Sequence, residues 1–448
     1  MENKGLKGFI DKITTEKAFE IYIIASMVAI PLFALMTETF GKPFITQPYV
    51  VEVIGIVGII LALCSVLKRK DNLYITDYLF LLLCIFASLS LAFSKSISES
   101  IQGFSYDEWF IHFLGYFSLM LAGTMINDET RRRRIIIAFL GVVVGHSLVA
   151  VFQTMDICIS PCYLKLDMYK VGKDISWGLT QHPNWYGGLS TLFCACSAGL
   201  FLFTENKRRR NMYLCINMVS FYTLLSAEAR LAWVGAISYV LFFAISIVVA
   251  KEKKLWKRYV VLLISMIVVI LFAIFVCGRI TERIAKTSTE LKSSNLEGLG
   301  SQRGYIWRYA LESVPDNWMF GVGLDNLTYA YISNPRFGPG SWLNQKAHNE
   351  YIHYLATQGV FQFVTYMTLL VYAVVRSVKT VLNTEDKSNK YVTWIFLGMF
   401  AAYSAQALFN SSVINIAPYF WITIGMCVPH KNQNSIKPKR IVKDKTNM

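Results

Sequence analysis

Charged side chains are scarce in this sequence. Asp, Glu, Lys and Arg make up 16% of the 448 residues, whereas hydrophobic residues make up 54%. A composition this apolar excludes an ordinary soluble fold and indicates a membrane protein. The net charge of +15 would suit a nucleic-acid-binding protein if the basic residues covered one face of a polar domain. They occur instead in short clusters between apolar runs, so we expect no nucleic-acid partner.

The sequence also lacks the glycine-rich loop followed by Lys that binds nucleotide phosphates, and it has no polar domain that could hold a nucleotide. Cysteine is informative at two positions. Cys158 and Cys162 fall in one predicted loop, where a disulfide and a pair of free thiols are both compatible with the sequence. A metal site would need more ligands than that loop offers, and we expect neither a metal nor another cofactor.

Apolar runs close to the ~20 residues needed to cross a bilayer recur along the whole chain. Short clusters of Lys and Arg lie between alternate runs, and Arg131 to Arg134 form the strongest of them. Because such clusters remain on the cytoplasmic side of a membrane, both termini are predicted to be cytoplasmic. The sequence therefore predicts an all-α polytopic membrane protein with twelve transmembrane helices, near residues 19–37, 49–67, 73–93, 109–126, 135–152, 185–204, 211–227, 230–250, 259–277, 351–375, 391–409 and 412–428.

The predicted helices divide the chain into five parts. Residues 1–18 fit an amphipathic helix on the cytoplasmic surface, because apolar side chains share one face and lysines flank it. Residues 19–277 hold transmembrane helices one to nine, and residues 351–428 hold helices ten to twelve. Between them, residues 278–350 form one long extracytoplasmic loop, and residues 429–448 form a basic cytoplasmic tail.

The long loop is the one extended polar segment of the chain, which indicates that chemistry takes place there. Residues 302–314 follow an amphipathic helical pattern that Pro315 ends. Gly321 and Gly323 suit a turn. Residues 287–300 are rich in Ser, Thr, Asn and Gly and are predicted to be flexible.

Two arginines and a histidine are the strongest candidate site residues. Arg230 lies in a tight outward turn between two apolar runs, where an arginine costs free energy unless it snorkels, pairs or binds an anion. Arg303 lies in the predicted helix of the loop, and His348 precedes the tenth transmembrane helix. Guanidinium groups bind phosphate bidentately, and histidine is the natural general base near neutral pH.

Five further polar residues are supporting candidates. Asn349 and Glu350 follow the histidine directly, and Arg308 shares the predicted helix of the loop, where it could merely solvate the polar face. His182 and Asn184 lie at the start of the sixth transmembrane helix, where exposed backbone amides favour an anion such as phosphate. An ordinary capped helix start is the competing interpretation of that pair.

Together these segments resemble the O-antigen ligase/polymerase family of polytopic membrane glycosyltransferases. The resemblance covers roughly residues 180–428. Two positions depart from the family pattern, because Ala229 stands where Ser often precedes the turn arginine and Ala347 stands where Thr often precedes the histidine. The segments that carry the resemblance are His182-Pro183-Asn184, the turn arginine Arg230, Arg303 followed by Trp307, the NWMFGVG stretch at 317–323 and the HNEYIHYLATQG stretch that begins at His348.

The resemblance implies a GT-C-like fold in the bacterial cytoplasmic (inner) membrane and a polyprenyl-diphosphate-linked oligosaccharide as the donor. It implies that His348 is the base or orienting group for the acceptor hydroxyl and that Arg230 and Arg303 bind the diphosphate. The substitution would be inverting and metal-independent, because diphosphate is a good leaving group. Further partners implied are a glycan or lipid acceptor, membrane lipids and other polysaccharide assembly proteins.

Three functions are compatible with this sequence. A polymerase would transfer a growing glycan from one lipid diphosphate to a new lipid-linked repeat unit of an O antigen or capsule, and this is the function we favour. A ligase would use the same donor but transfer the finished glycan to lipid A core or another surface acceptor. A flippase or transporter would need charged or broken helices at mid-membrane, whereas the polar residues here gather in the loop.

Overall fold

The computed structural model describes residues 2–35, 46–103, 108–155, 175–180, 182–276, 279–292, 299–331 and 345–432. Within these ranges the chain forms α-helices, short 3-10 helices and loops, and no β-strand is present. The predicted all-α membrane fold is therefore confirmed. Cys158 and Cys162 lie outside the described residues, as does the basic tail after Asn432, so the statements about them stay predictions.

Each of the twelve predicted transmembrane segments falls on a helix. The surface helix predicted at residues 1–18 is shorter than expected, because α1 ends at Ile13 and the next helix begins at Glu16. In chain order the helices are α1 (Glu2–Ile13), α2 (Glu16–Leu35), α3 (Thr46–Lys68), α4 (Ile75–Ala92), α5 (Ile97–Gln102), α6 (Phe110–Thr124), α7 (Glu129–Thr154), α8 (Pro183–Phe203), α9 (Lys207–Ser226), α10 (Arg230–Ala250), α11 (Lys253–Val276), α12 (Arg279–Lys292), α13 (Leu299–Glu312), η4 (Pro315–Asn317), η5 (Leu327–Tyr331), α14 (Glu350–Asn383), α15 (Lys387–Gln406), η6 (Ala407–Phe409), α16 (Ala417–Cys427) and η7 (His430–Asn432).

Nine helices among the described residues are long and apolar enough to cross a membrane. The three other predicted transmembrane helices are shorter or more charged: α6 has 15 residues, α16 has 11, and α9 begins with four consecutive basic residues. At 1.5 Å per residue, α6 and α16 cannot cover a hydrocarbon core of about 30 Å by themselves. Both are nevertheless part of the bundle interior, since all of α16 and most of α6 are buried.

Glycine pairs bring α6 unusually close to two neighbouring helices. A Cβ atom on Gly425 of α16 would lie 2.0 Å from the carbonyl oxygen of Met120, and a Cβ atom on Gly115 would lie 2.7 Å from Cα of Gly55 in α3. Small residues allow this backbone contact, which drives helix association inside a membrane, where burying apolar surface against other apolar surface gains little. The other central helix is α8, whose membrane-spanning residues are all buried.

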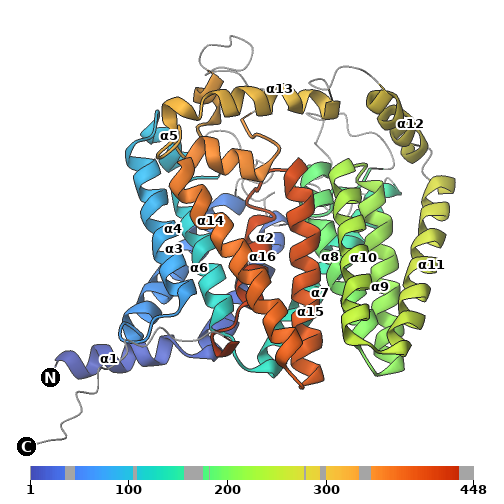
Figure 1. Cartoon of the computed structure of the whole chain (residues 1–448), viewed down its shortest axis with the longest axis horizontal. Coiled ribbons are helices and arrows are strands. Elements are labelled where there is room, and N and C mark those ends of the chain that lie inside the picture. The colour runs from blue at the N-terminus through green and yellow to red at the C-terminus, as the bar shows by residue number, and fades with distance from the viewer. Residues whose placement is uncertain are drawn as a thin grey trace, which may run out of the picture.

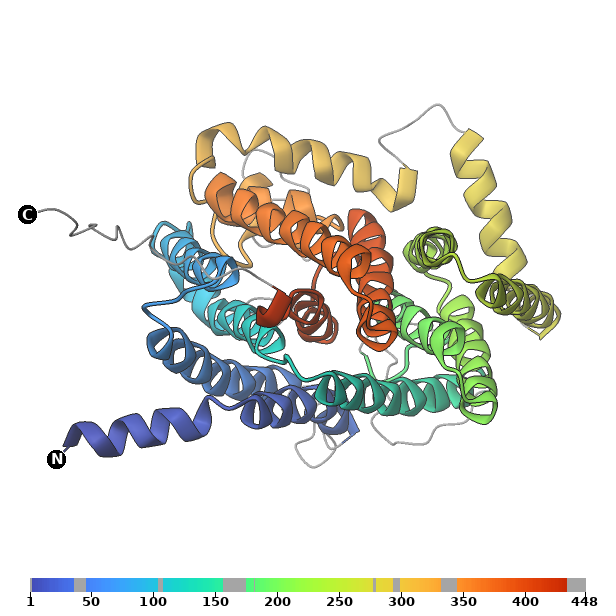
Figure 2. The ribbon, with the colours of Figure 1, turned by 60° about the horizontal axis from the view of Figure 1, so that its bottom comes forward.

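The long helices run up and down, so the connections between them lie at two opposite ends of the bundle (Figure 1). At one end, which we call the basic end, lie α1 and the first turns of α7, α9, α11 and α15. Ion pairs such as Lys254–Glu205 (2.8 Å) and Lys387–Glu252 (3.2 Å) join the helices there. At the opposite end, which we call the site end, α5, α12 and α13 lie across the tips of the long helices. Figure 2 shows α16 surrounded by the other helices.

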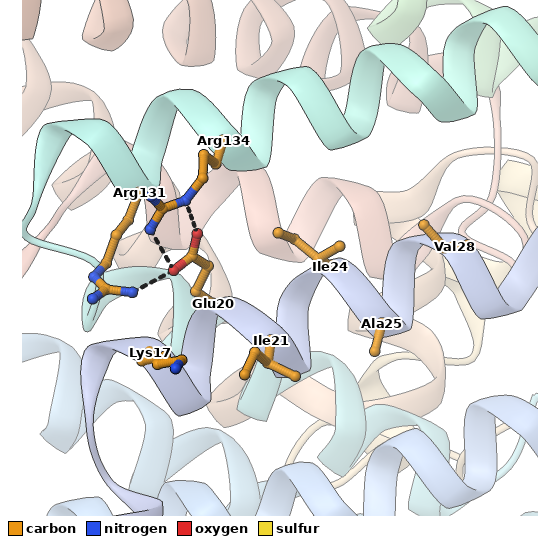
Figure 3. A pocket seen from close by; sticks show the side chains of 8 residues that line it. All are labelled: Lys17, Glu20, Ile21, Ile24, Ala25, Val28, Arg131 and Arg134. Carbon is orange, nitrogen blue, oxygen red and sulfur yellow. Dashed lines mark hydrogen bonds and ion pairs between the residues drawn. The ribbon is translucent and has the colours of Figure 1, made fainter.

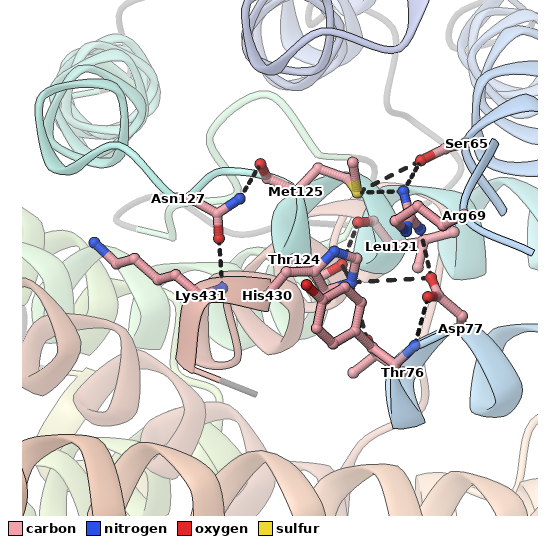
Figure 4. A network of polar contacts seen from close by, with 11 residues as sticks. Ser65, Arg69, Thr76, Asp77, Leu121, Thr124, Met125, Asn127, His430 and Lys431 are labelled. Atoms are coloured by element: carbon pink, nitrogen blue, oxygen red, sulfur yellow. Dashed lines mark hydrogen bonds and ion pairs between the residues drawn. The ribbon is translucent and has the colours of Figure 1, made fainter. Parts of the chain in front are cut away.

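A buried polar network holds the end of the last helix at the basic end (Figure 4). Nε2 of His430 lies 3.0 Å from Oγ1 of Thr124 in α6, and its ring stacks on Tyr74 with centroids 4.1 Å apart. Asp77 in α4 accepts hydrogen bonds from Arg69 (2.6 Å) and from the backbone N–H of Tyr74 (2.8 Å). The segment that follows α16 is therefore fixed to α4 and α6.

The long polar loop is anchored to a kink in α14. Gly359 interrupts that helix with φ +79°, and the backbone N–H of Val322 in the loop donates to the carbonyl of Ala356 at 3.0 Å. A Cβ atom on Gly359 would lie 2.3 Å from the carbonyl oxygen of Met319, so the loop can dock there only because this residue is glycine. The anchor fixes the loop to the helix that carries the candidate histidine at its start.

The loop contains more helix than the sequence predicted. The amphipathic pattern at 302–314 is α13, and Pro315 begins η4, as expected. The prediction that residues 287–300 are flexible is wrong for 287–292, which complete α12, and for 299–300, which begin α13. The hydroxyl groups of Thr287 and Thr289 donate to backbone carbonyls four residues earlier, at 2.7 and 3.0 Å. Such bonds let threonine occupy a helix despite its low propensity.

Candidate functional site

A tight turn between α9 and α10 brings Arg230 to the site end. α9 ends at Ser226 and α10 begins at Arg230, and Glu228 between them has φ +51°. Ala229 is fully buried, and a Cβ atom on Gly187 of α8 would lie 2.5 Å from its Cβ. This close packing fixes Arg230 at the first position of α10, beside the central helix.

Arg303 lies on α13 and faces the bundle. Its Nη1 donates to the backbone carbonyl of Phe409 in η6 at 2.7 Å. Burial and the positive charges of Arg230 and Arg283 lower the pKa of Arg303 to about 10. The three arginines come from elements that meet at the site end, since α12 contacts α13 and Arg283 of α12 bonds to the turn before Arg230. All three remain charged at physiological pH and can bind an anion.

Arg283 is the member of this group that the sequence analysis did not single out. It lies on α12, and its Nε donates to the backbone carbonyl of Glu228 at 3.3 Å, so it contacts the same turn that presents Arg230. One signal in the sequence could have found it. Arg279, Arg283 and Lys286 are spaced four and three residues apart, which places three basic side chains on one face of a helix.

His348 lies near Arg303 at the start of α14. Its φ of +49° is in the left-handed region, which is uncommon for residues other than glycine, and its backbone N–H donates to Oγ of Ser411 at 2.9 Å. Burial and the charges of Arg303 and His182 lower the pKa of His348 to about 3. The imidazole is therefore neutral at physiological pH and can accept a hydrogen bond or a proton.

His182 and Asn184 form a helix cap. Nδ1 of His182 accepts a hydrogen bond from the backbone N–H of Asn184 at 3.0 Å, and Pro183 is the first residue of α8. This is the capped helix start that the sequence left open as the competing interpretation. His182 nevertheless lies close to the site, since its charge contributes to the lowered pKa of His348, and burial lowers its own pKa as well.

Asn349 and Glu350 have structural partners. Oδ1 of Asn349 accepts a hydrogen bond from the backbone N–H of Ile352 at 3.1 Å, which caps α14. Glu350 is buried, and its two carboxylate oxygens accept hydrogen bonds from the hydroxyl groups of Tyr366 and Tyr403, each at 2.7 Å. These two residues therefore support the histidine by holding the first turn of α14 in place.

Arg308 is separated from the other arginines. It lies five residues after Arg303, which turns it about 140° around α13. The side chain is exposed, its Nε lies 3.5 Å from Glu312, and its guanidinium group lies 4.9 Å from the ring centre of Tyr309. These contacts within α13 support the interpretation that Arg308 solvates the polar face of the helix.

A buried charge cluster supports the segment that leads to His348, and the sequence analysis missed it. Nζ of Lys346 lies 2.6 Å from Oε2 of Glu108 and 3.3 Å from Oδ1 of Asp325, and all three side chains are 1% exposed. Burial alone would lower the pKa of Lys346, but the two carboxylates outweigh it and raise that pKa, so the lysine stays charged. The cluster joins the residues before α6, the loop after α13 and the approach to α14.

The described part of the site combines two chemical capacities. Three guanidinium groups can bind phosphate oxygens, and a neutral imidazole beside them can accept a proton. No group of three or more His, Cys, Asp and Glu side chains is placed to hold a metal ion within the described ranges. The expectation that the reaction is metal-independent stays a prediction.

The sequence model of one known family, described as O-Antigen ligase, matches residues 215–367, about a third of the chain. No curated protein matches the chain. The matched range begins in α9 and ends in α14, so it contains the three arginines and His348 but neither His182 nor Glu108. Together with the helices that can span a membrane, this match supports a resemblance of residues 215–367 to the O-antigen ligase/polymerase family of membrane glycan-processing proteins.

Proposed function

We propose that this protein is a membrane glycosyltransferase that polymerises lipid-linked repeat units of a surface polysaccharide such as an O antigen or capsule. The donor is a polyprenyl-diphosphate-linked oligosaccharide, and the acceptor is a hydroxyl group on the next lipid-linked unit. One observation carries the proposal. Arg303 and the buried His348 both donate hydrogen bonds to residues 409–411, where the long loop meets the ends of the membrane helices, and the charges of Arg230 and Arg283 act on Arg303.

The arginine cluster binds the diphosphate of the donor. Each guanidinium group can donate two parallel hydrogen bonds to a phosphate group. Arg230 and Arg303 are the principal ligands, and Arg283 contributes because it contacts the same turn as Arg230. Burial and, to a smaller extent, the positive charges of Arg230 and Arg283 lower the pKa of Arg303, and a doubly charged diphosphate offsets the effect of those charges. The polyprenyl chain remains in the membrane, beside the ends of α10 and α14.

The reaction is a displacement at the anomeric carbon of the donor sugar. The acceptor oxygen forms a bond to that carbon while the bond from the carbon to the phosphate oxygen breaks. The electron pair leaves with the diphosphate, whose charge the arginines stabilise, and the acceptor proton passes to His348. A direct displacement inverts the anomeric configuration. Because the diphosphate is a good leaving group, the chemistry requires neither a strong general acid nor a metal ion.

The histidine becomes a better base when the donor binds. With a pKa of about 3, His348 accepts a proton poorly in the empty site. The positive charge of Arg303 is one of the causes of that low pKa. A bound diphosphate neutralises this charge and raises the pKa of His348 toward its ordinary value. Base strength therefore increases at the step in which an acceptor proton has to be removed.

The clusters of Lys and Arg at the basic end support a cytoplasmic position for that end and for both termini. The site end then faces the extracytoplasmic side of the bacterial inner membrane. A donor activated as a lipid diphosphate suits that side, because nucleotide sugars are made in the cytoplasm and a lipid-linked unit arrives already activated.

The test is the length of glycan on the polyprenyl carrier and on the cell surface. It compares cells that lack the protein with cells that carry the wild type, His348→Ala or Arg303→Gln. Arg308→Gln is the matched control, since it removes the same charge from the same helix on the side away from the site. For a polymerase, single repeat units accumulate on the carrier in the null strain and in both site variants, whereas Arg308→Gln restores polymer.

Other outcomes would contradict the proposal. Full-length polymer stranded on the carrier would indicate a ligase that transfers finished glycan to lipid A core or another acceptor. Loss of all extracytoplasmic lipid-linked units would indicate a flippase. Unchanged glycan length with His348→Ala, in protein that is folded and inserted, would remove the histidine from the reaction.

A further inference from the structure

A groove between α2 and α7 at the basic end has a lining that neither the family match nor the proposed reaction explains (Figure 3). The cavity has a volume of about 690 Å³ and lies far from the arginine cluster, at the other end of the bundle. Charged residues line one end of the groove, and apolar residues line the rest of it. The charged residues that line it are Lys17, Glu20, Arg131 and Arg134, and the apolar ones are Ile21, Ile24, Ala25 and Val28.

The charged end of the groove carries excess positive charge. Glu20 is only 8% exposed and accepts hydrogen bonds from both Arg131 and Arg134, one of them from Nη2 of Arg134 at 2.9 Å. Glu16 lies 3.9 Å from Arg131 and adds a second carboxylate nearby. The lining itself therefore holds three cations and one carboxylate, Glu20, while Glu16 and Asp128 act on the arginines from outside it. Arg134 remains 52% exposed beside Glu20. Nitrogen donors are available for an anion at this end.

The apolar part continues from the charged end toward the middle of the bundle. Residues 17, 21, 24 and 28 lie at helical spacing along one face of α2, and Ile21 and Val28 are 58% and 43% exposed. On α7, Gly141 and Gly145 follow Arg134 on the same face. Both glycines are exposed, and a Cβ atom on either would meet no atom within 4 Å. A strip of open space therefore extends from Arg134 along the membrane-facing side of α7.

A second groove at the same end provides a comparison. It has a volume of about 500 Å³ and is lined by Arg133, Lys387 and other residues. In that groove Arg133 lies 2.8 Å from Glu129, and Lys387 lies 3.2 Å from Glu252, which also pairs with Lys254 at 3.3 Å. Both grooves therefore combine cations with apolar residues, and the groove between α2 and α7 differs because the open space at Gly141 and Gly145 follows its cations along α7.

We propose that the groove between α2 and α7 binds an anionic phospholipid from the leaflet at the basic end. The phosphate group lies against Arg131, Arg134 and Lys17, and one acyl chain lies along Ile21 to Val28 and the glycine face of α7. A soluble phosphate would use only the charged end, whereas a phospholipid matches both walls in the order in which they occur across a membrane. A zwitterionic lipid would leave the excess positive charge without a partner.

The test is native mass spectrometry of the full-length protein, titrated with dioleoyl phosphatidylglycerol or dioleoyl phosphatidylcholine. We expect phosphatidylglycerol to bind more tightly. Arg134→Gln should weaken its binding about fivefold, the usual effect of one basic residue near an anionic membrane. Arg208→Gln is the matched control, because Arg208 is exposed in the first turn of α9 at the same end and does not line the groove. We expect this control to leave binding unchanged.

A second variant tests the apolar wall without changing charge. Replacing Gly141 and Gly145 together with Leu should fill the open strip and weaken the binding of phosphatidylglycerol, while leucine favours the helix more than glycine does. If Arg134→Gln does not yield folded protein, Lys17→Gln is expected to weaken binding in the same direction. Equal binding of the two lipids, equal effects of Arg134→Gln and Arg208→Gln, or competition by millimolar inorganic phosphate alone would each overturn the proposal.

Discussion

Replacing Lys346 with Met removes the ammonium group that lies between two buried carboxylates. Glu108 and Asp325 are both 1% exposed, at 2.6 and 3.3 Å from Nζ, so water reaches neither of them easily. Removing one partner of a buried ion pair typically costs about 3–5 kcal/mol, because the remaining charge has no compensation. Two carboxylates are left here, so we expect the upper part of that range unless one of them takes up a proton.

The assay is the apparent free energy of unfolding, measured by titrating the protein in mixed micelles with sodium dodecyl sulfate and following tryptophan fluorescence. Lys95→Met is the control, because Lys95 is an exposed lysine at the same end of the bundle. Its effect should stay within about 0.5 kcal/mol. Adding Glu108→Gln and Asp325→Asn to Lys346→Met should recover much of the lost stability, since the triple variant buries no charge at the cluster.

The same variant should lower activity, because Lys346 lies two residues before His348 and helps to hold its left-handed backbone conformation. A loss of stability similar to that of Lys95→Met would refute the reasoning that the cluster is buried and charged. A large loss that the triple variant does not reverse would show that lysine packing, rather than charge, stabilises the loop.

Three further predictions concern the site and its scaffold. The pKa of about 3 for His348 predicts that kcat/KM for transfer stays constant from pH 7.5 down to pH 5. In Arg303→Gln the fall of kcat/KM at acid pH should begin at a higher pH, because losing a neighbouring positive charge raises the pKa of the histidine. Gly359→Ala should destabilise the protein by more than about 1 kcal/mol in the same unfolding titration, because it adds a Cβ atom 2.3 Å from a carbonyl oxygen at φ +79°; unchanged stability would exclude the kink. Asn349→Ala should cost about 1 kcal/mol of stability through loss of the cap of α14, whereas Asn349→Asp should restore it.

The sequence predicted the features that depend on local pattern. Hydropathy found a helix at each of the twelve positions, and the amphipathic repeat found α13. Hydropathy did not find the length of every helix, since α16 begins only at Ala417, five residues after the predicted start, although residues 412–416 are buried. It could not, because an apolar loop packed inside a bundle and an apolar helix have the same composition. In α12, threonines suggested a loop, but their hydroxyl groups bond within the helix.

Pairings between distant charges could not be predicted at all. Lys346 is 238 residues from its partner Glu108, and no pattern in the sequence predicts that the two residues pair. Glu350 was grouped with His348 because the two are neighbours in the chain, yet its carboxylate bonds to Tyr366 and Tyr403, on later parts of the bundle. Chain proximity therefore grouped Glu350 with the histidine, whereas its carboxylate partners come from residues that the sequence does not place beside it.

Buried charges such as those of Asp77 and Lys346 lie beside opposite charges, whereas like charges come together at the site. Asp77 and Lys346 are buried, and each is met by opposite charge from another segment. Around Arg303 the charges that shift its pKa, those of Arg230 and Arg283, have the same sign as its own. Holding like charges together in a partly buried place lowers stability, and folds retain such an arrangement mainly where function requires it. The proposed diphosphate donor would supply negative charge, so the gathering of like charges around Arg303 supports an anion-binding role more strongly than the presence of any single arginine does.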